Sequence, residues 1–263
     1  VQMKIIQVNE RNLEIVQQNS ECSVMALGFF DGVHKGHQQV ILAAKEEAKK
    51  AGLKLAVMSF FPHPKTVFSN EEIEYLMPME EKAERFKKLG VDLFYLIDFT
   101  KSFAALAPEQ FIDKYLVRLN VQHAVAGYDY TYGKKGAGTI DDIAAHSNHR
   151  VRVTKVEKFA IYGEKVSSTC IRSKLKNGQV EEIAVLLGRP YEVKYDVKNG
   201  VSSYYKLPEP GRYYVTIICG KRAISQAIYV QDSQWVSCQN ELPTEECKII
   251  FHQRVSQKVL KSS

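Results

Sequence analysis

Residues 28–37 read Gly28-Phe29-Phe30-Asp31-Gly32-Val33-His34-Lys35-Gly36-His37, and this segment connects a predicted strand to a predicted helix. The apolar run Ser23–Phe29 leads into it and predicts a short buried strand. Apolar residues then recur at helical spacing and predict a helix over Gly36–Ala51, with Gly52 as its C-cap. The first backbone N–H groups of such a helix have no partners within it, so they form an anion site. The segment therefore predicts a site for a phosphate-bearing ligand.

Outward from this segment, strand-like and helix-like runs alternate up to residue 188. The expected strands are Leu53–Phe60, Val91–Phe99, Val121–Gly127, Val151–Val156 and Phe159–Val166. The expected helices are Glu80–Leu89, Pro108–Leu119, Thr139–Ser147 and Val180–Leu187. This alternation predicts an α/β fold with a doubly wound parallel sheet and helices on both faces. Ligands in such folds bind beyond the carboxyl ends of the strands, where residues 28–37 and 127–138 both fall.

The alternation of predicted strands and helices ends at Gly188-Arg189-Pro190. Tyr213–Cys219, Ala223–Val230 and Ile249–Val255 are rich in strand-forming residues, and Gly220 marks a hairpin break between the first two. We therefore predict two domains, residues 1–188 and residues 189–263, the second being a small antiparallel β module.

Composition excludes several classes of protein. The 263 residues are 45% hydrophobic and 25% charged, as in ordinary soluble domains, and no run approaches the roughly 18 apolar residues of a membrane span. The N-terminus lacks the pattern of a signal peptide, and the five cysteines form no Cys-x-x-Cys pair. A cytoplasmic location is the expectation, with no membrane partner. A net charge of +6 is too mild to predict nucleic-acid binding.

His34 and His37 flank the first turn of the predicted helix. Imidazole groups there can hydrogen-bond phosphate oxygens and stabilise the charge that develops during phosphoryl or nucleotidyl transfer. Gly36 between them lets a nucleotide approach the backbone closely. The structural alternative is that one histidine caps the helix while the other is solvated. No third histidine, cysteine or carboxylate has a matching local spacing, so no protein metal site is predicted.

Three further segments carry polar or aromatic groups at expected strand ends or helix starts. Ser167-Ser168-Thr169 with Arg172 offers donors for a triphosphate, although three hydroxyls before a helix are also typical of an ordinary N-cap. Gly127–Gly138 combines glycines, tyrosines and lysines, which suits a flavin or adenine bed or a surface loop with packed tyrosines. Phe60-Phe61-Pro62-His63-Pro64 holds His63 in an extended turn.

Together these motifs resemble a known family. Residues 28–37 resemble the HxGH signature of nucleotidyltransferases, and in detail the flavin adenylyltransferase module of prokaryotic FAD synthetases. The resemblance continues in the same order through 60–64, 103–111, 127–138 and 167–172, and it weakens after residue 190.

The resemblance implies transfer of AMP from ATP to FMN, giving FAD and pyrophosphate, with Mg²⁺ carried mainly by the phosphates and water. His34, His37 and Arg172 would be the catalytic residues. The implied ATP-binding residues are Gly28, Phe29, Phe30, Asp31, Gly32, Gly36, Ser167, Ser168 and Thr169. The implied FMN-binding residues are Phe61, His63, Asp129, Tyr130 and Tyr132.

The C-terminal module departs from the family pattern. Bifunctional members carry a riboflavin kinase barrel with a Gly-x-Pro-Thr-Ala-Asn segment, which is missing between Tyr191 and Leu207, and Pro243-Thr244 is followed by two glutamates. We therefore predict no riboflavin kinase activity. Two alternatives stay open at this point: transfer to another phosphorylated metabolite, and a non-catalytic flavin or nucleotide regulator. The sequence is silent on oligomeric state.

Overall fold

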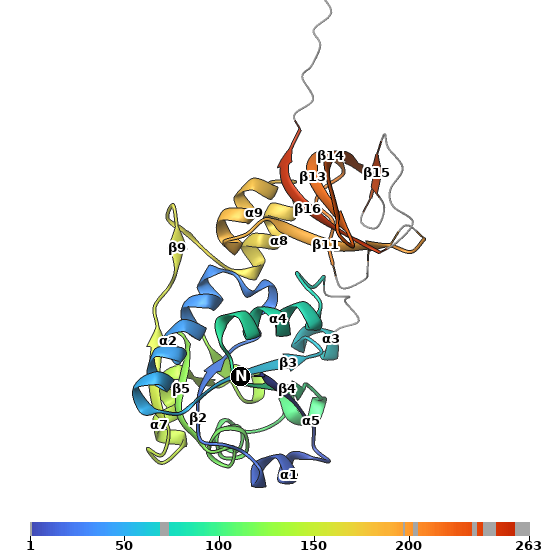
Figure 1. The fold of residues 1–263 in the computed structure, drawn as a ribbon. Helices are drawn as coiled ribbons and strands as arrows, with labels where there is room; N and C mark the ends of the chain where they lie inside the picture. Colours follow the sequence, from blue (N-terminus) through green and yellow to red (C-terminus); the bar gives the residue numbers. More distant parts are fainter. Residues whose placement is uncertain are drawn as a thin grey trace, which may run out of the picture. The chain divides into compact units, whose positions relative to one another are not determined.

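The computed structural model describes residues 2–68, 74–196, 198–201, 205–232, 236–238 and 246–255. The chain divides into two compact units (Figure 1). Unit 1 comprises Val1–Ile73 with Met79–Ala160, and unit 2 comprises Glu74–Pro78 with Ile161–Ser263. The Pro243-Thr244 pair lies outside the described residues.

Unit 1 is built on a six-stranded parallel sheet in the order β1-β4-β3-β2-β5-β8. The strands are β1 (Lys4–Val8), β2 (Ser23–Leu27), β3 (Lys54–Phe61), β4 (Leu93–Asp98), β5 (Val121–Gly127) and β8 (Arg152–Val156). All five residues of the central strand β2 are buried, as expected for a strand covered on both faces. The predicted α/β class with a parallel sheet is confirmed.

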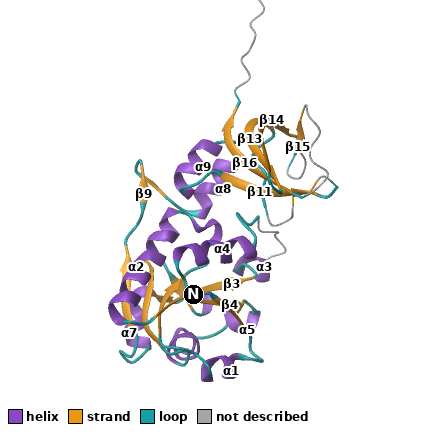
Figure 2. Cartoon of the chain, viewed as in Figure 1, coloured by secondary structure: helices purple, strands orange, loops and turns teal. Residues whose placement is uncertain are grey.

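Helices cover both faces of this sheet (Figure 2). On one face lie α2 (Lys35–Ala51) and α4 (Met79–Leu89), and the Phe86 ring of α4 packs edge-on against Phe94 of β4. On the other face, one apolar cluster joins the sheet to α6 (Pro108–Ile112), a π-helical turn (Asp113–Val117) and α7 (Ile143–His146). The remaining helices of unit 1 are short: α1 (Leu13–Gln18), α3 (Pro64–Phe68) and α5 (Lys101–Ala104).

The strand order creates a switch point between β2 and β5. From β2 the chain moves to its neighbour β3, whereas from β5 it moves to β8 on the opposite side. The connections therefore leave the carboxyl ends of β2 and β5 in opposite directions, and open α/β sheets bind ligands in such a crevice. Residues 28–34 follow β2 and residues 128–138 follow β5, so both segments begin at this point.

Unit 2 contains an antiparallel sheet in the order β12-β11-β16-β13-β14-β15. Its strands are β11 (Tyr191–Asp196), β12 (Gly200–Val201), β13 (Gly211–Cys219), β14 (Arg222–Val230), β15 (Val236–Cys238) and β16 (Cys247–Arg254). Two helices, α8 (Ser168–Lys176) and α9 (Val180–Leu187), precede the sheet, and α9 packs on β11 and β16. The predicted antiparallel module is confirmed.

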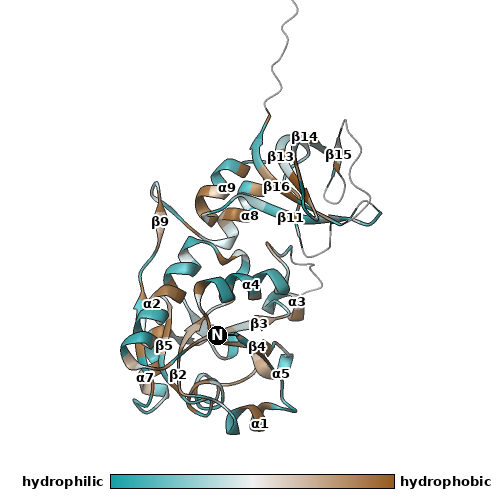
Figure 3. Cartoon of the chain, viewed as in Figure 1, coloured by the Kyte–Doolittle hydropathy of each residue, from teal (hydrophilic) through white to brown (hydrophobic). Residues whose placement is uncertain are grey.

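The compact units divide earlier than the boundary predicted after residue 188. The division falls at residues 160/161 because α9 buries Val180, Ile183, Leu186 and Leu187, and it contacts strands β11 and β16. Figure 3 shows the hydrophobic colouring of α9. A helix with such an apolar side belongs to the core that covers it. The extent of the nucleotidyltransferase domain as a functional segment stays a prediction.

Three predicted elements differ from the observed ones. Phe159–Val166 is a hairpin of β9 (Ala160–Ile161) and β10 (Glu164–Lys165), because Tyr162 and Gly163 take positive φ angles of 52° and 81°. The helix predicted over Pro108–Leu119 changes from α to π geometry at Asp113. Thr139–Ser147 is a 3₁₀ turn (Ile140–Asp142) followed by α7. Within the described ranges, no helix has the length and apolar character that crossing a membrane requires.

Candidate active site

The segment between β2 and α2 is a tight turn built on positive φ angles. Phe30, Gly32 and Val33 have φ angles of 54°, 78° and 41°. The buried Phe30 ring packs edge-on against the rings of His37 and Phe86, at centroid distances of 5.3 and 5.8 Å. A Cβ atom on Gly28 would come within 2.9 Å of the Phe30 ring. Gly28 is therefore required for the position of Phe30, and Phe30 in turn supports His37.

His34 and His37 lie against each other at the start of α2. Their rings stack with centroids 3.5 Å apart and an interplanar angle of 18°. His34 is the N-cap of the helix, and its Nδ1 accepts a hydrogen bond of 3.2 Å from the backbone N–H of His37. An accepting Nδ1 leaves Nε2 to carry the proton of the neutral His34 ring. The structural alternative is therefore right that a histidine caps the helix.

The second half of that alternative, a solvated His37, is wrong. His37 is partly buried, and its Nδ1 is enclosed with no hydrogen-bond partner among the described residues. Burial lowers the pKa of His37 well below 6.5, and electrostatic interactions with His34 and Lys82 lower it further. Because desolvation disfavours the imidazolium form, His37 is neutral at pH 7. A neutral, enclosed imidazole with an unpartnered nitrogen is a candidate ligand contact.

Lys82 of α4 lies beside this pair and was not among the predicted site residues. Its side chain is 1% exposed, and its Nζ donates a 3.0 Å hydrogen bond to the backbone carbonyl of Phe29. The same ammonium group lies 4.5 Å from the centroid of the Phe29 ring. Burial lowers the pKa of Lys82 to about 8, against the opposing effect of Asp31. The sequence held one signal for this residue, since Lys82 precedes the apolar Phe86 by one helical turn.

Of the two predicted flavin residues at the end of β3, Phe61 and His63, His63 adjoins the turn. His63 packs edge-on against the Phe29 ring at 4.5 Å, and its Nδ1 accepts a 3.2 Å hydrogen bond from the backbone N–H of Lys65. Phe61 is half-buried and precedes Pro62 in a cis peptide bond. Phe29 therefore connects His63 with the histidine turn.

The segment after β5 combines an exposed edge with packed tyrosines. Asp129 is exposed, whereas Tyr132 is buried against Phe111, and its hydroxyl lies 2.7 Å from Nδ1 of His146. Tyr130 stacks on Tyr132 at 6.1 Å. Burial raises the pKa of both hydroxyls, so both tyrosines stay neutral. Packing of this kind supports the alternative of a loop with tyrosines underneath, and a flavin role for either ring stays a prediction.

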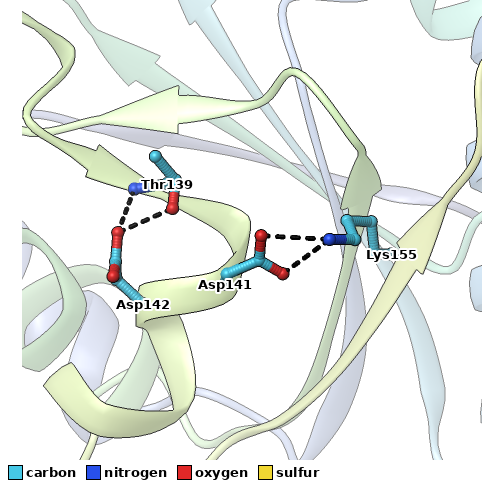
Figure 4. A network of polar contacts seen from close by, with 4 residues as sticks. All are labelled: Thr139, Asp141, Asp142 and Lys155. Atoms are coloured by element: carbon cyan, nitrogen blue, oxygen red, sulfur yellow. Dashed lines mark hydrogen bonds and ion pairs between the residues drawn. The ribbon is translucent and has the colours of Figure 1, made fainter.

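A polar network fixes the end of this segment (Figure 4). The backbone N–H and the hydroxyl of Thr139 both donate to Asp142, at 2.8 and 2.6 Å. Asp141 accepts two hydrogen bonds from Nζ of Lys155 in β8, at 2.8 and 3.0 Å. The chain is thus held on both sides of the turn that leads into α7.

The predicted triphosphate residues belong to unit 2, whereas the two histidines belong to unit 1. These residues are Ser167, Ser168, Thr169 and Arg172. Ser167 is the N-cap of α8, and its hydroxyl accepts a 3.2 Å hydrogen bond from the backbone N–H of Cys170. Nε of Arg172 donates to the carbonyl of Glu74 at 2.9 Å. The N-cap interpretation of Ser167 is confirmed, and the role of these residues toward phosphate stays a prediction.

The residues that the structure describes contain no group of three histidine, cysteine or acidic side chains that could hold a metal ion. The donors that Mg²⁺ prefers are carboxylate, carbonyl, water and phosphate oxygens. The described residues therefore do not fit a protein-built magnesium cage.

The chain matches a family model and several known proteins. The model of the FAD synthetase family matches residues 16–170. A Listeria monocytogenes protein named bifunctional riboflavin kinase/FMN adenylyltransferase is 42% identical over 260 residues, covering 88% of this chain and 83% of the relative. A Listeria protein named FAD synthetase is 33% identical over 202 residues, covering 74% of this chain and 82% of its own length.

Two further relatives differ in coverage. A Bacillus subtilis protein with the same bifunctional name is 45% identical over 200 residues, and the match spans 63% of that protein. A crystal structure of a Streptococcus pneumoniae protein named macrolide-efflux protein has a TM-score of 0.83 at 26% identity, over 97% of this chain and 100% of that chain. The family match covers the histidine turn and the segments after β3 and β5, and it ends inside α8. The chain belongs to the FAD synthetase family.

Proposed function

We propose that this protein transfers AMP from ATP to FMN, giving FAD and pyrophosphate, and that it does not phosphorylate riboflavin. The observation that carries the proposal is the stacked His34–His37 pair at the start of α2, directly after β2 at the switch point of the sheet. Family membership supports the choice of reaction, because relatives carry the names FMN adenylyltransferase and FAD synthetase. A cytoplasmic location stays a prediction from the sequence.

Nucleotidyl transfer of this kind needs positioning and charge stabilisation more than covalent chemistry. A phosphate oxygen of FMN attacks the α-phosphorus of ATP in line, the bond to the bridging oxygen breaks, and pyrophosphate leaves. A ring N–H of His34 and of His37, together with backbone N–H groups at the start of α2, would donate to the α-phosphate oxygens as negative charge gathers there. His37 is suited to this role because burial keeps it neutral and holds its ring against Phe30.

The remaining roles rest on the motif series. We propose that Ser168, Thr169 and Arg172 hold the departing phosphates, and that Phe61, His63 and Asp129 contact the flavin. Mg²⁺ would neutralise phosphate charge when bound with ATP, and we assign it no protein ligand. The lack of a Gly-x-Pro-Thr-Ala-Asn segment supports the absence of kinase activity.

The test is a pair of incubations with Mg-ATP, one containing FMN and the other riboflavin, followed by chromatography of the flavins. We expect FAD and pyrophosphate in equal amounts from FMN, and unchanged riboflavin in the second incubation. FMN or FAD formed from riboflavin would refute the monofunctional assignment. Failure to form FAD from FMN would refute adenylyl transfer to this acceptor, and pyrophosphate release with another phosphorylated acceptor would then identify a different nucleotidyltransferase.

A further inference from the structure

We propose that Lys82 is a positioning residue for adenylyl transfer: its ammonium group holds the turn between β2 and α2 through the Phe29 carbonyl and places a positive charge near His37. This inference rests on the proposed function. Lys82 lies in α4 and contacts the turn at the backbone carbonyl of Phe29, one of the predicted ATP-binding residues.

The Phe29 carbonyl accepts two hydrogen bonds, one from Nζ of Lys82 at 3.0 Å and one from the hydroxyl of Ser59 at 2.8 Å. Lys82 also lies over the Phe29 ring. A carbonyl held by two donors cannot rotate, so the peptide that leads into Phe30 has one orientation. Phe30 then fixes the ring of His37 from the side.

Charged groups also meet at the turn between β2 and α2. The charged and titratable groups that face this region are Lys82 from α4, Asp31 from the turn, and His34 and His37 from the start of α2. Asp31 and Lys82 are each 1% exposed, and the negative charge of Asp31 favours the charged form of Lys82. The positive charge of Lys82 opposes protonation of His37. Burying an ammonium group costs desolvation free energy, and an apolar side chain would fill the same space without that cost. Stability alone would therefore favour an apolar side chain at position 82.

Three variants separate this role from simple packing. Lys82→Met keeps the length of the stem and removes the charge, Ser59→Ala removes the other donor to the Phe29 carbonyl, and Lys87→Met removes an exposed lysine of the same helix. We expect Lys82→Met to lower kcat for FAD formation about 10- to 100-fold, the scale of a small misplacement of reacting groups. Ser59→Ala should cost less and keep the wild-type pH profile, and Lys87→Met should match the wild type.

The decisive readout is the acid side of the pH profile. The positive charge of Lys82 opposes protonation of His37, so the acidic limb of kcat should lie at a higher pH in Lys82→Met than in the wild type. If Lys82→Met does not fold, an unchanged kcat in Ser59→Ala would overturn the anchoring role of the Phe29 carbonyl. An unchanged kcat and unchanged profile in a folded Lys82→Met protein would overturn the proposal.

A second measurement does not depend on activity. In proton NMR titrations, the His37 signal should titrate at a higher pH in Lys82→Met than in the wild type, because the repelling charge has been removed. The signal is assigned by its loss in His37→Gln. An unchanged titration would refute the electrostatic role of Lys82 while leaving FAD formation untouched. If the wild type forms no FAD but the His37 titration still shifts in Lys82→Met, the proposed function is refuted and the electrostatic role of Lys82 stands.

Discussion

His37→Ala is expected to lower kcat for FAD formation by about 100- to 1,000-fold, the cost of removing one preorganised donor at a site of developing charge. His37 is held by Phe30 and His34, so its ring donates without reorganisation during the reaction. The measurement is single-turnover FAD formation at saturating Mg-ATP and FMN. The free energy of unfolding should change little, because the His37 side chain is only partly buried.

The matched control for this prediction is His149→Asn. His149 is exposed and has a φ of 58°, a left-handed conformation that asparagine tolerates. This variant should keep wild-type turnover. Wild-type turnover in His37→Ala would remove His37 from the mechanism, and an equal loss in both variants would point to a general effect on the fold.

The stability of His37→Ala should also depend on pH. The folded-state pKa of His37 is lowered below the value of 6.5 for the unfolded chain. As pH falls below 6.5, His37 therefore becomes protonated in the unfolded state while it stays neutral in the folded state. The free energy of unfolding of the wild type decreases as a result. The variant lacks this linkage, so its difference in free energy of unfolding from the wild type should shrink between pH 7 and pH 5. Urea unfolding at both values measures it.

Gly178→Ala is expected to destabilise unit 2 by about 2–5 kcal/mol, combining left-handed strain with overpacking. Gly178 lies in the turn between α8 and α9 with a φ of 67°. A Cβ atom there would come within 2.5 Å of the Tyr213 hydroxyl and 2.7 Å of Nη1 of Arg254. Arg254 donates to the Asn177 carbonyl at 2.9 Å and pairs with Glu209 at 2.7 Å. The substitution should therefore break the contacts that hold the end of α8 on the sheet.

Gly163→Ala is the control for Gly178→Ala, because Gly163 has a φ of 81° with nothing within 4 Å of its added Cβ. It carries only the left-handed cost of about 1–2 kcal/mol. Denaturant unfolding compares the two free energies. Since we assign Ser168, Thr169 and Arg172 of α8 to the triphosphate, Gly178→Ala should also raise KM for ATP more than Gly163→Ala. Equal free energies of unfolding in the two variants would contradict the clamping role of Arg254.

Much of the fold is readable from local pattern. The strand Val121–Gly127 was predicted at its observed bounds, and α2 begins at Lys35, one residue before the predicted start, because apolar periodicity and glycine punctuation agree there. Strand β1 was not predicted: only Val8 of its five residues is buried, so its sequence lacks the pattern of a covered strand. Its place is set by pairing with β4, which no local pattern reveals.

The site was predictable to the extent that its residues are contiguous. His34 and His37 share one turn, and their spacing revealed them. Lys82 lies in a helix about fifty residues away, and only the packing of α4 beside the turn brings its ammonium group to Phe29. The division between the compact units at residues 160/161 is not readable from local pattern, because the apolar side of α9 does not reveal which sheet covers it.

The membership of α8 in unit 2 gives the C-terminal β module a structural role beyond its own fold. On the proposed function, kinase chemistry is gone, yet the helix that bears Arg172 still rests on a turn clamped by residues of β13 and β16. In related proteins, deletions and substitutions in this module should therefore occur mainly in its connecting loops, and Tyr213 and Arg254 should stay unchanged.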